Sequence, residues 1–250
     1  MRATWSILVA IAALLVPLEH TRADGKDAQE ILRKMDEAQS GFEDQYMLIR
    51  LTVREPSGDS RSFEFKFYQK GAEKRLIRFI SGDNKGMAML TEGPSKVYVY
   101  LPGMRKVRKI ATHALKQNVA GSDFSHQDMA AVKWSDLYRA RLVSEDKETV
   151  TLECTPEPGK DAPYPRVVMT IDKKTHLQRK VEYYDEKGHK IKTMVASNPK
   201  EFEGGHVMNT KVVMTDARTG HSTTMEILEF KPNQGLRDSM FTVRQLLWGR

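Results

Sequence analysis

The alternation that decides the fold starts with MLIRLTVR at residues 47–54, pauses at EPSGD in residues 55–59, and resumes as SFEFKF at residues 62–67. In both runs apolar side chains occupy every second position, and most of the side chains between them are polar or charged. A period of two is typical of a β-strand with one buried and one solvated face. The proline and glycine between the runs favour a turn. The stretch therefore predicts an antiparallel hairpin.

Similar runs follow along most of the chain. We expect strands at residues 74–80, 87–91, 96–101, 133–144, 148–155, 166–172, 178–185, 189–196, 206–215 and 222–230. Short turns separate most of these runs, which indicates an antiparallel meander and not βαβ units. A sheet of this many strands has to curl or close. Its inner face then encloses either packed side chains or a cavity.

Three segments have a different pattern. Residues 27–39 carry apolar side chains at helical spacing, and Gly41 follows as a stop signal. Residues 103–121 form a long basic connection, after which Ser122 or Asp123 can cap a short helix over residues 122–131. Residues 238–248 predict a final turn or short helix. The expected fold class is mainly β (α+β), a single domain in which helices lie against the concave face of a curved sheet.

The N-terminus has the layout of an export signal. Arg2 precedes an apolar run at residues 7–16, Pro17 ends that run, and Thr21 and Ala23 are small residues at the −3 and −1 positions of a cleavage site. The run is too short to span a bilayer as a helix, which takes about 20 residues. A permanent membrane anchor is the alternative interpretation. We expect residues 1–23 to be a signal peptide and residues 24–250 to be one soluble domain in the periplasm.

Composition limits the chemistry further. Cys154 is the only cysteine, so the exported chain has no internal disulfide, and its place in an alternating run indicates a buried structural thiol. The formal net charge of +7 favours anionic membrane surfaces or acidic partners over nucleic acid for an exported protein.

Apolar residues on the inner parity are candidates to line a ligand cavity. Methionine suits a wall that adapts to a variable apolar ligand. An ordinary packed core is the alternative. The candidates are Met47, Ile49, Leu51, Phe63, Phe65, Phe67, Ile77, Phe79, Met87 and Met89 from the strands, with Phe124 and Met129 from the expected mid-chain helix.

No catalytic pattern is present in the sequence. Ser122, His126 and Asp128 are close together, but Ser and Asp at a helix start are more often caps, and the Gly-x-Ser-x-Gly pattern is absent. The seven histidines lack metal-ligand spacing, and phosphate loops and dinucleotide fingerprints are missing. The sequence therefore predicts no enzyme, no cofactor, no metal site and no nucleic-acid partner.

Two stretches carry a family resemblance. VYVYLPGMRKVRKI at residues 97–110, followed by GSDFSHQDM at residues 121–129, resembles the outer-membrane lipoprotein-sorting proteins, relatives of the periplasmic carriers LolA and LolB. DSMF at residues 238–241 fits as well, and the resemblance covers residues 27–241. It implies a half-open, strongly curved antiparallel β-barrel closed by an N-terminal helix and short capping helices.

The resemblance also implies a function. It is the binding and shuttling of lipid, or of the acyl chains of lipoproteins, by a monomer that contacts membranes or an exporter of the resistance-nodulation-division (RND) type. A non-carrier accessory or structural subunit of such an exporter is the alternative. The classical carriers hold their helices closed with an arginine inside the barrel, and the sequence does not identify its counterpart.

The basic cluster Arg105, Lys106, Arg108 and Lys109 follows the strand at residues 96–101. We expect it in a loop near the mouth of the barrel, where it would meet anionic headgroups or an acidic partner. A merely solvated loop is the alternative.

Overall fold

The structure, a computed structural model, describes residues 25–93, 96–130, 133–202 and 204–248. The expected signal peptide lies outside the described residues. The elements in chain order are α1 (Gly25–Ser40), β1 (Asp44–Arg54), β2 (Ser60–Lys70), β3 (Lys74–Phe79), β4 (Ala88–Glu92), β5 (Val97–Leu101), β6 (Lys106–Lys109), the 3₁₀ helix η1 (Thr112–Ala114), α2 (Trp134–Leu137), β7 (Tyr138–Glu145), β8 (Thr149–Pro156), β9 (Arg166–Asp172), β10 (Gln178–Tyr184), β11 (Lys190–Phe202), β12 (His206–Asp216), β13 (Ser222–Pro232), the 3₁₀ helix η2 (Asp238–Met240) and α3 (Val243–Trp248).

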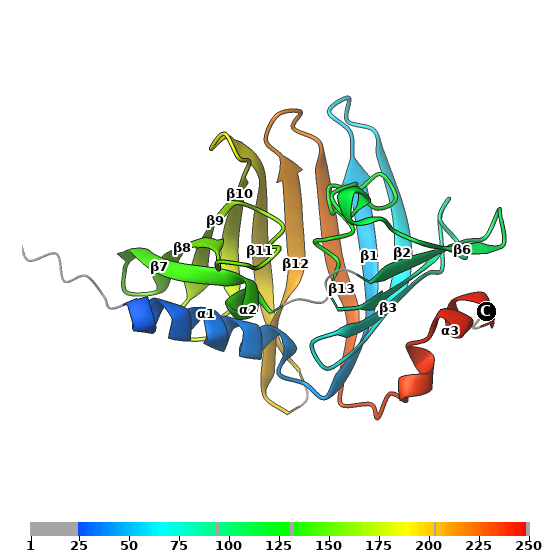
Figure 1. Cartoon of the computed structure of the whole chain (residues 1–250), viewed down its shortest axis with the longest axis horizontal. Helices are drawn as coiled ribbons and strands as arrows, with labels where there is room; N and C mark the ends of the chain where they lie inside the picture. The colour runs from blue at the N-terminus through cyan, green and yellow to red at the C-terminus, as the bar shows by residue number, and fades with distance from the viewer. Residues whose placement is uncertain (1–24, 94–95, 131–132, 203, 249–250) are drawn as a thin grey trace, which may run out of the picture.

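These strands form one antiparallel sheet of 13 strands in the order β6-β5-β4-β3-β2-β1-β13-β12-β11-β10-β9-β8-β7. Strands that are consecutive in the chain pair with each other, except β6 and β7, which are the two edges, and β1 also pairs with β13. The sheet curls strongly around one side, and its two edges remain unpaired with each other (Figure 1). The predicted fold class is confirmed: this is an open, strongly curved antiparallel barrel.

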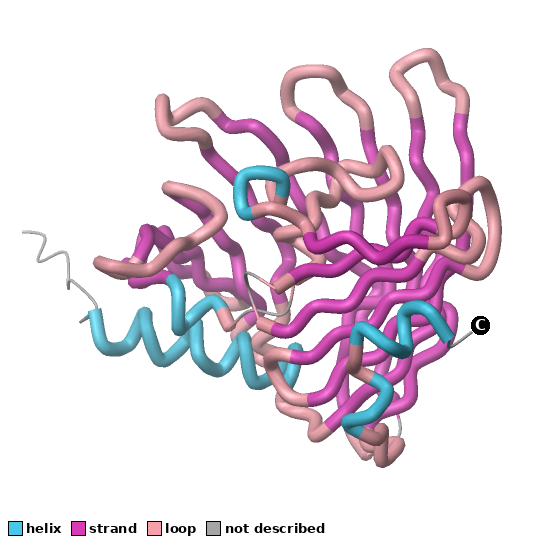
Figure 2. The backbone as a smooth tube through the Cα atoms, turned by 45° about the vertical axis from the view of Figure 1, so that its right-hand side comes forward, coloured by secondary structure: helices cyan, strands magenta, loops and turns pink. Residues whose placement is uncertain are grey.

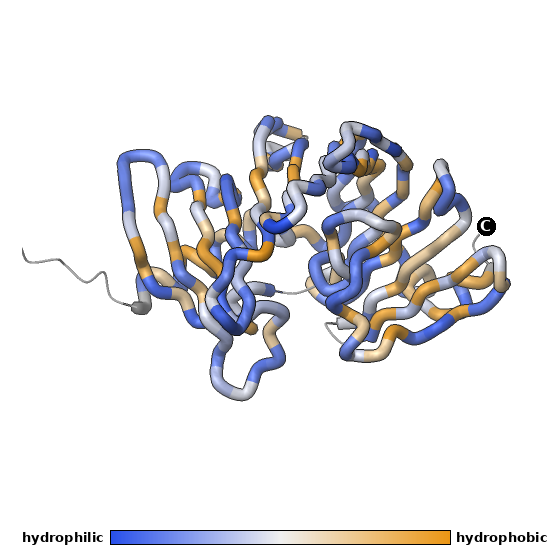
Figure 3. The backbone as a smooth tube through the Cα atoms, turned by 90° about the horizontal axis from the view of Figure 1, so that it is seen from above, coloured by the Kyte–Doolittle hydropathy of each residue, from blue (hydrophilic) through white to orange (hydrophobic). Residues whose placement is uncertain are grey.

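The register explains which side chains face inward. Met47 pairs with Phe67, Phe67 with Ile77, and Ile77 with Met89, so these four residues form one row across β1 to β4. Side chains in such a row share one face of the sheet. All four lie in the main hydrophobic core or pack against it. Hydrophobic and hydrophilic residues alternate along the strands when the sheet is viewed from above (Figure 3).

The predicted N-terminal helix is present as α1. Its residues Leu32 and Met35 are fully buried in the main core, and the helix packs beside β7 and α2. The Asp36 carboxylate accepts hydrogen bonds from the backbone N–H groups of Trp134 and Ser135 at 3.0 and 2.8 Å. These bonds satisfy the N–H groups at the start of α2 and fix the two helices to each other.

The outer face of the sheet is not wet everywhere, contrary to the alternation-based expectation. Leu76, Leu90 and Tyr100 of β3, β4 and β5 are buried against Phe241 and Leu246 of the C-terminal segment. Helix α3 therefore covers the outer side of these strands. None of the helices in the described part of the chain is both long and apolar enough to cross a bilayer.

The prediction of a helix over residues 122–131 was wrong. Residues 115–130, in the connection between β6 and β7, fold back as a compact loop, which we call the strap. The strap lies across the concave side of the sheet (Figure 2). The backbone N–H of Val119 donates to the Phe124 carbonyl at 2.8 Å, and that of His126 donates to the Gln117 carbonyl at 3.0 Å. Ala120 and Gly121, both at positive φ, reverse the chain between these bonds. The cross-loop bonds take the place of helical ones.

Candidate functional site

A cavity of about 300 Å³ lies on the concave side of the sheet, between its strands, the end of α1 and the strap. Its volume is at the lower end of the range for small-molecule pockets. Most of its wall is apolar, and its apolar lining residues are Met47, Ile49, Phe65, Phe67, Ile77, Phe124, Met129, Ala130, Trp134, Pro163, Leu177, Met194, Met208, Met214, Met225 and Ile227. Tyr164 and Tyr183 add aromatic rings, and the polar lining residues include Gln45, Gln69, Arg75, Asp128, Gln178 and Asn209.

Seven of the twelve residues predicted from the sequence line this cavity: Met47, Ile49, Phe65, Phe67, Ile77, Phe124 and Met129. The other five, Leu51, Phe63, Phe79, Met87 and Met89, belong to the core beside it or pack against that core. The ring centroids of Phe63 and Phe79 lie 5.5 Å apart, so these rings fill space by packing on each other. The candidates on the strands face inward, but the cavity occupies only part of the inner face.

The residues of the opposite cavity wall were not predicted from the sequence. Met194, Met208, Met214 and Met225 come from β11, β12 and β13, and Ile227 follows on β13. Part of the signal was available in the sequence, because Met208 and Met214 share one strand parity and Met225 lies between the polar residues Thr224 and Glu226. The register places Met194 opposite Met214, and Val212 opposite Met225. The cavity is therefore lined by methionine from several separate elements, and methionine adapts its shape easily.

Side chains of the sheet hold the strap at its middle. Asp123 of the strap accepts a hydrogen bond from the Thr223 hydroxyl at 2.7 Å, and its backbone N–H donates to that hydroxyl at 2.9 Å. The His221 ring nitrogen Nδ1 lies 2.7 Å from the same carboxylate. Asp123 therefore ties the strap to β13 and to the turn before it, and it does not cap a helix.

A buried ion pair holds the next part of the strap. Asp128 pairs with Lys192 of β11, and side-chain exposures of 7% and 11% show that both charges are nearly out of water. The Tyr164 hydroxyl donates to the Asp128 carboxylate at 2.7 Å, and the Ser125 backbone N–H and hydroxyl both donate to it at 2.8 Å. Burial, with the nearby Asp128 charge, raises the pKa of Tyr164, which keeps it a hydrogen-bond donor.

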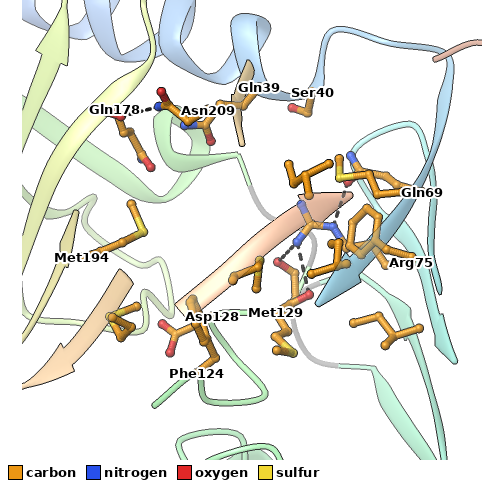
Figure 4. A pocket seen from close by; sticks show the side chains of 18 of the residues that line it. Gln39, Ser40, Gln69, Arg75, Phe124, Asp128, Met129, Gln178, Met194 and Asn209 are labelled. Atoms are coloured by element: carbon orange, nitrogen blue, oxygen red, sulfur yellow. Dashed lines mark hydrogen bonds between the residues drawn. The ribbon is translucent and has the colours of Figure 1, made fainter. Parts of the chain in front are cut away.

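Arg75 of β3 holds the end of the strap. Its Nη1 donates to the backbone carbonyl oxygens of Met129 at 3.2 Å and Ala130 at 2.7 Å (Figure 4). Its Cζ lies 5.6 Å from the centroid of the Phe67 ring. Burial lowers the pKa of Arg75 to about 10, so the guanidinium remains charged at neutral pH. An arginine inside the barrel is thus present, although the sequence did not identify it.

The basic cluster lies elsewhere. Lys106, Arg108 and Lys109 belong to the short edge strand β6, and Arg105 is in the turn before it, so the expected loop is partly a strand. All four side chains are exposed. None of them lines the cavity.

The reactive side chains singled out in the sequence are buried or engaged in local contacts. Burial raises the pKa of the Cys154 thiol to about 12, so the thiolate is not populated at neutral pH. The Ser122 hydroxyl donates to the Val119 carbonyl at 2.7 Å. His126 lies 3.4 Å from the Met89 sulfur, and burial lowers its pKa. Across the described ranges, no three His, Cys, Asp or Glu side chains converge as metal ligands.

Comparison with known proteins supports the fold. The model of a family described as "Uncharacterized protein" matches residues 71–248. No curated protein sequence matches the chain.

Three solved structures are similar over nearly their whole lengths. An outer membrane lipoprotein-sorting protein domain from Vibrio parahaemolyticus has a TM-score of 0.82 at 22% identity, covering 90% of this chain and 100% of its own. A DUF1329 family protein from Desulfovibrio piger has a TM-score of 0.82 at 25% identity, covering 88% and 98%. A LolA superfamily protein from Nitrosomonas europaea has a TM-score of 0.73 at 22% identity, covering 87% and 98%. The resemblance expected from the sequence is confirmed at the level of the fold.

Proposed function

The chain belongs to the family whose model matches residues 71–248 and has the fold of the LolA superfamily, and from this premise we propose that it is a carrier of lipid or lipoprotein acyl chains. The observation that carries the proposal is the methionine-rich cavity on the concave side of the sheet. An apolar, partly enclosed space with a few polar groups is the usual form of a site for an amphiphilic ligand.

Energetics favour an enclosed site over a surface patch. Removing an acyl chain from a bilayer costs about 0.8 kcal/mol for each CH₂ group that leaves the hydrocarbon. Only a site that shields most of the chain from water offsets this cost. The cavity offers apolar shielding from flexible methionines on both of its walls, at Met47 and Met129 on one side and Met194, Met214 and Met225 on the other.

The strap is the part of the wall that can open. Within the described residues, its polar contacts with the sheet are made chiefly by the side chains of Arg75, Lys192, His221 and Thr223. Its one β-bridge joins Asn118 to Ser125 and so lies inside the strap itself. Opening the strap breaks these bonds and exposes its buried apolar residues Leu115, Val119, Phe124 and Met129, but it leaves the strand pairing of the sheet intact. Movement of such covers commonly admits ligands to enclosed sites.

We place this activity in the periplasm, between the two membranes. The N-terminal export pattern at residues 1–23 supports that location, and the family resemblance supports an RND-type exporter as the donor of cargo. The exposed basic residues of β6 suit transient contact with an anionic membrane or an acidic face of the exporter. In this proposal the protein binds and transfers, without catalysing a reaction.

A charge placed in the cavity wall tests the proposal. Met225→Asp puts a carboxylate into the apolar wall, where an ionised group is strongly disfavoured, and we expect at least about a tenfold loss of acyl-ligand affinity. Binding of a fluorescent fatty-acyl probe measures this loss.

The matched control is Thr224→Asp, one residue earlier on the same strand. Thr224 pairs with Thr52, whose hydroxyl lies in an exposed contact with Ser62, so it belongs to the outer face. This variant should bind as the wild type does. Equal loss in both variants, with thermal unfolding unchanged, would show that the cavity is not the acyl site.

A further inference from the structure

Arg75 is a cation without a carboxylate partner in the cavity. Among the described residues, no Asp or Glu oxygen lies within 4.0 Å of its guanidinium. The guanidinium donates instead to neutral acceptors, the Gln69 side-chain oxygen and the carbonyl oxygens of Met129 and Ala130. Its Nη2 makes no hydrogen bond with any of the described residues. Charges taken out of water are costly unless they are paired, so an anion is the group that this position lacks.

Lys192 shows the contrast within the same region. Its ammonium group is buried but pairs with Asp128, and it also lies 5.0 Å from the Tyr164 ring centroid and 5.1 Å from that of Tyr183. Of these two cations, one has a counter-ion built into the protein and the other has only neutral acceptors. Arg75 lines the cavity directly and remains partly accessible from it.

A second unpaired group lies beside Arg75. Gln45 is only 3% exposed, lines the cavity, and its side-chain oxygen Oε1 has no hydrogen-bond partner among the described residues. Its Nε2 donates to Gln69 Oε1 at 3.1 Å. A buried acceptor without a donor is uncommon and destabilising.

The hydrogen-bond network fixes these orientations. Gln69 Oε1 accepts from Gln45 Nε2 and from Arg75 Nε at 3.0 Å, while Gln69 Nε2 donates to the Gly71 carbonyl at 2.9 Å. Reversing the Gln69 amide would put an NH₂ group against two donors, so the Gln45 oxygen is left as the free acceptor. Arg75, Gln69 and Gln45 thus form one connected polar group in the cavity wall. Figure 4 shows Arg75 and Gln69 side by side in this wall.

We propose that Arg75, Gln69 and Gln45 form a headgroup site, and that the ligand is an amphiphile whose head carries an anionic phosphate or carboxylate beside a hydrogen-bond donor such as a hydroxyl. The anion pairs with the Arg75 guanidinium, whose planar donors suit an oxyanion. The donor satisfies Gln45 Oε1, and the acyl chain lies along the methionine wall. This inference rests on the proposed function, because it assigns the polar end of the same ligand.

The site also couples to the strap. Arg75 Nη1 now binds the Met129 and Ala130 carbonyl oxygens, and an anionic headgroup competes with these neutral acceptors for the same guanidinium. A charged acceptor forms the stronger bond. An Arg75 that only holds the strap would affect all ligands alike, whereas a headgroup site discriminates between ligands by charge.

The test compares two ligands that differ only in the phosphate, myristoyl lysophosphatidic acid and monomyristoylglycerol, by isothermal titration of the full exported chain. We expect the wild type to bind the phosphate-bearing lipid about ten- to a hundredfold more tightly. Arg75→Gln should abolish this preference. The matched control, Arg78→Gln, should keep it, because Arg78 lies on the same strand and donates to the carbonyl of Gln245 in α3, on the outer face.

Two further arms complete the test. Removing the one free glycerol hydroxyl of the phosphate lipid should weaken wild-type binding about three- to tenfold, as expected for an acceptor at Gln45 left without its donor. Inorganic phosphate at millimolar concentration should not displace the lipid, and displacement would overturn the proposal by showing a simple anion site.

Other outcomes separate the inference from the function it rests on. Equal wild-type affinities for the two lipids, or an Arg75→Gln variant that weakens both by the same factor, would overturn the headgroup site and leave the carrier intact. Failure of the wild type to bind either lipid would contradict the carrier itself. Thermal unfolding of each variant verifies that it is folded.

Discussion

At the residue scale, the strap depends on a few charged side chains that the sheet supplies. Asp128 is the most heavily bonded of its residues, with Lys192, Tyr164 and Ser125 all directed at one carboxylate. A buried ion pair contributes little net stability by itself, but removing one partner leaves the other charge buried and unpaired. We therefore expect the pair to be important for keeping the strap against the sheet.

Lys192→Met tests this dependence. The variant leaves the Asp128 carboxylate without its cation, and we expect a loss of about 3–5 kcal/mol in the free energy of unfolding, measured by urea denaturation. The double variant Lys192→Met with Asp128→Asn should recover most of that loss, because no charge is then buried. Lys190 lies on the same strand as Lys192 and pairs with Glu182 of β10 at the surface. Lys190→Met should therefore change stability little. A double variant as unstable as the single one would contradict the account.

Residues of this kind are hard to assign from sequence. Ser122 and Asp123 stand where the cap of a short helix would stand, with Asp128 one turn further on, and local rules favour that interpretation. The true partners of the two aspartates lie far along the chain: Thr223 of β13 and His221 of the turn before it for Asp123, and Lys192 of β11 for Asp128. Arg75 likewise looks like an ordinary strand residue until the strap carbonyl groups lie against it.

At the element scale, alternation predicted most of the sheet. Arg166–Asp172 has the same bounds in the prediction and in the structure, and most other strands agree within a few residues. The exceptions have physical reasons. Trp134–Leu137 forms a helical turn where a strand was expected, because Asp36 of α1 accepts the N–H groups that begin it. The strap has no period at all, since long-range side-chain contacts determine its path.

The edge strand β6 carries an element-scale prediction. Arg105, Lys106, Arg108 and Lys109 are exposed and concentrated on one edge of the sheet. Reversing all four to glutamate should leave the fold intact, because exposed charges contribute little to stability. It should reduce the rate of lipid transfer to vesicles that contain anionic lipid, measured with a quenched fluorescent acyl probe.

Two controls make this prediction specific. Transfer to vesicles of neutral lipid should be similar for both proteins. The wild-type rate to anionic vesicles should fall as salt rises over the physiological range, because exposed charges are screened within about 10 Å at 0.1 M. Equal rates and equal salt dependence in the two proteins would mean that β6 is only a solvated edge.

At the scale of the whole molecule, the two halves of the sheet build one cavity together. Strands β1 to β3 supply one wall and β10 to β13 the other, and the pairing of β1 with β13 joins them. Alternation marked the inward face of the first half, yet it did not show where the inner side chains would leave space. That depends on how the sheet curves and on the strap, which local sequence patterns do not encode.

The central claim is that this cavity holds an acyl-bearing lipid in the exported protein. Native mass spectrometry of the chain purified from the periplasm without detergent measures this directly. We predict a population whose extra mass matches one acyl-bearing lipid, enriched in anionic headgroups, and its loss in Met225→Asp. A chain that stays ligand-free, both as purified and after incubation with a total membrane-lipid extract, would contradict the account.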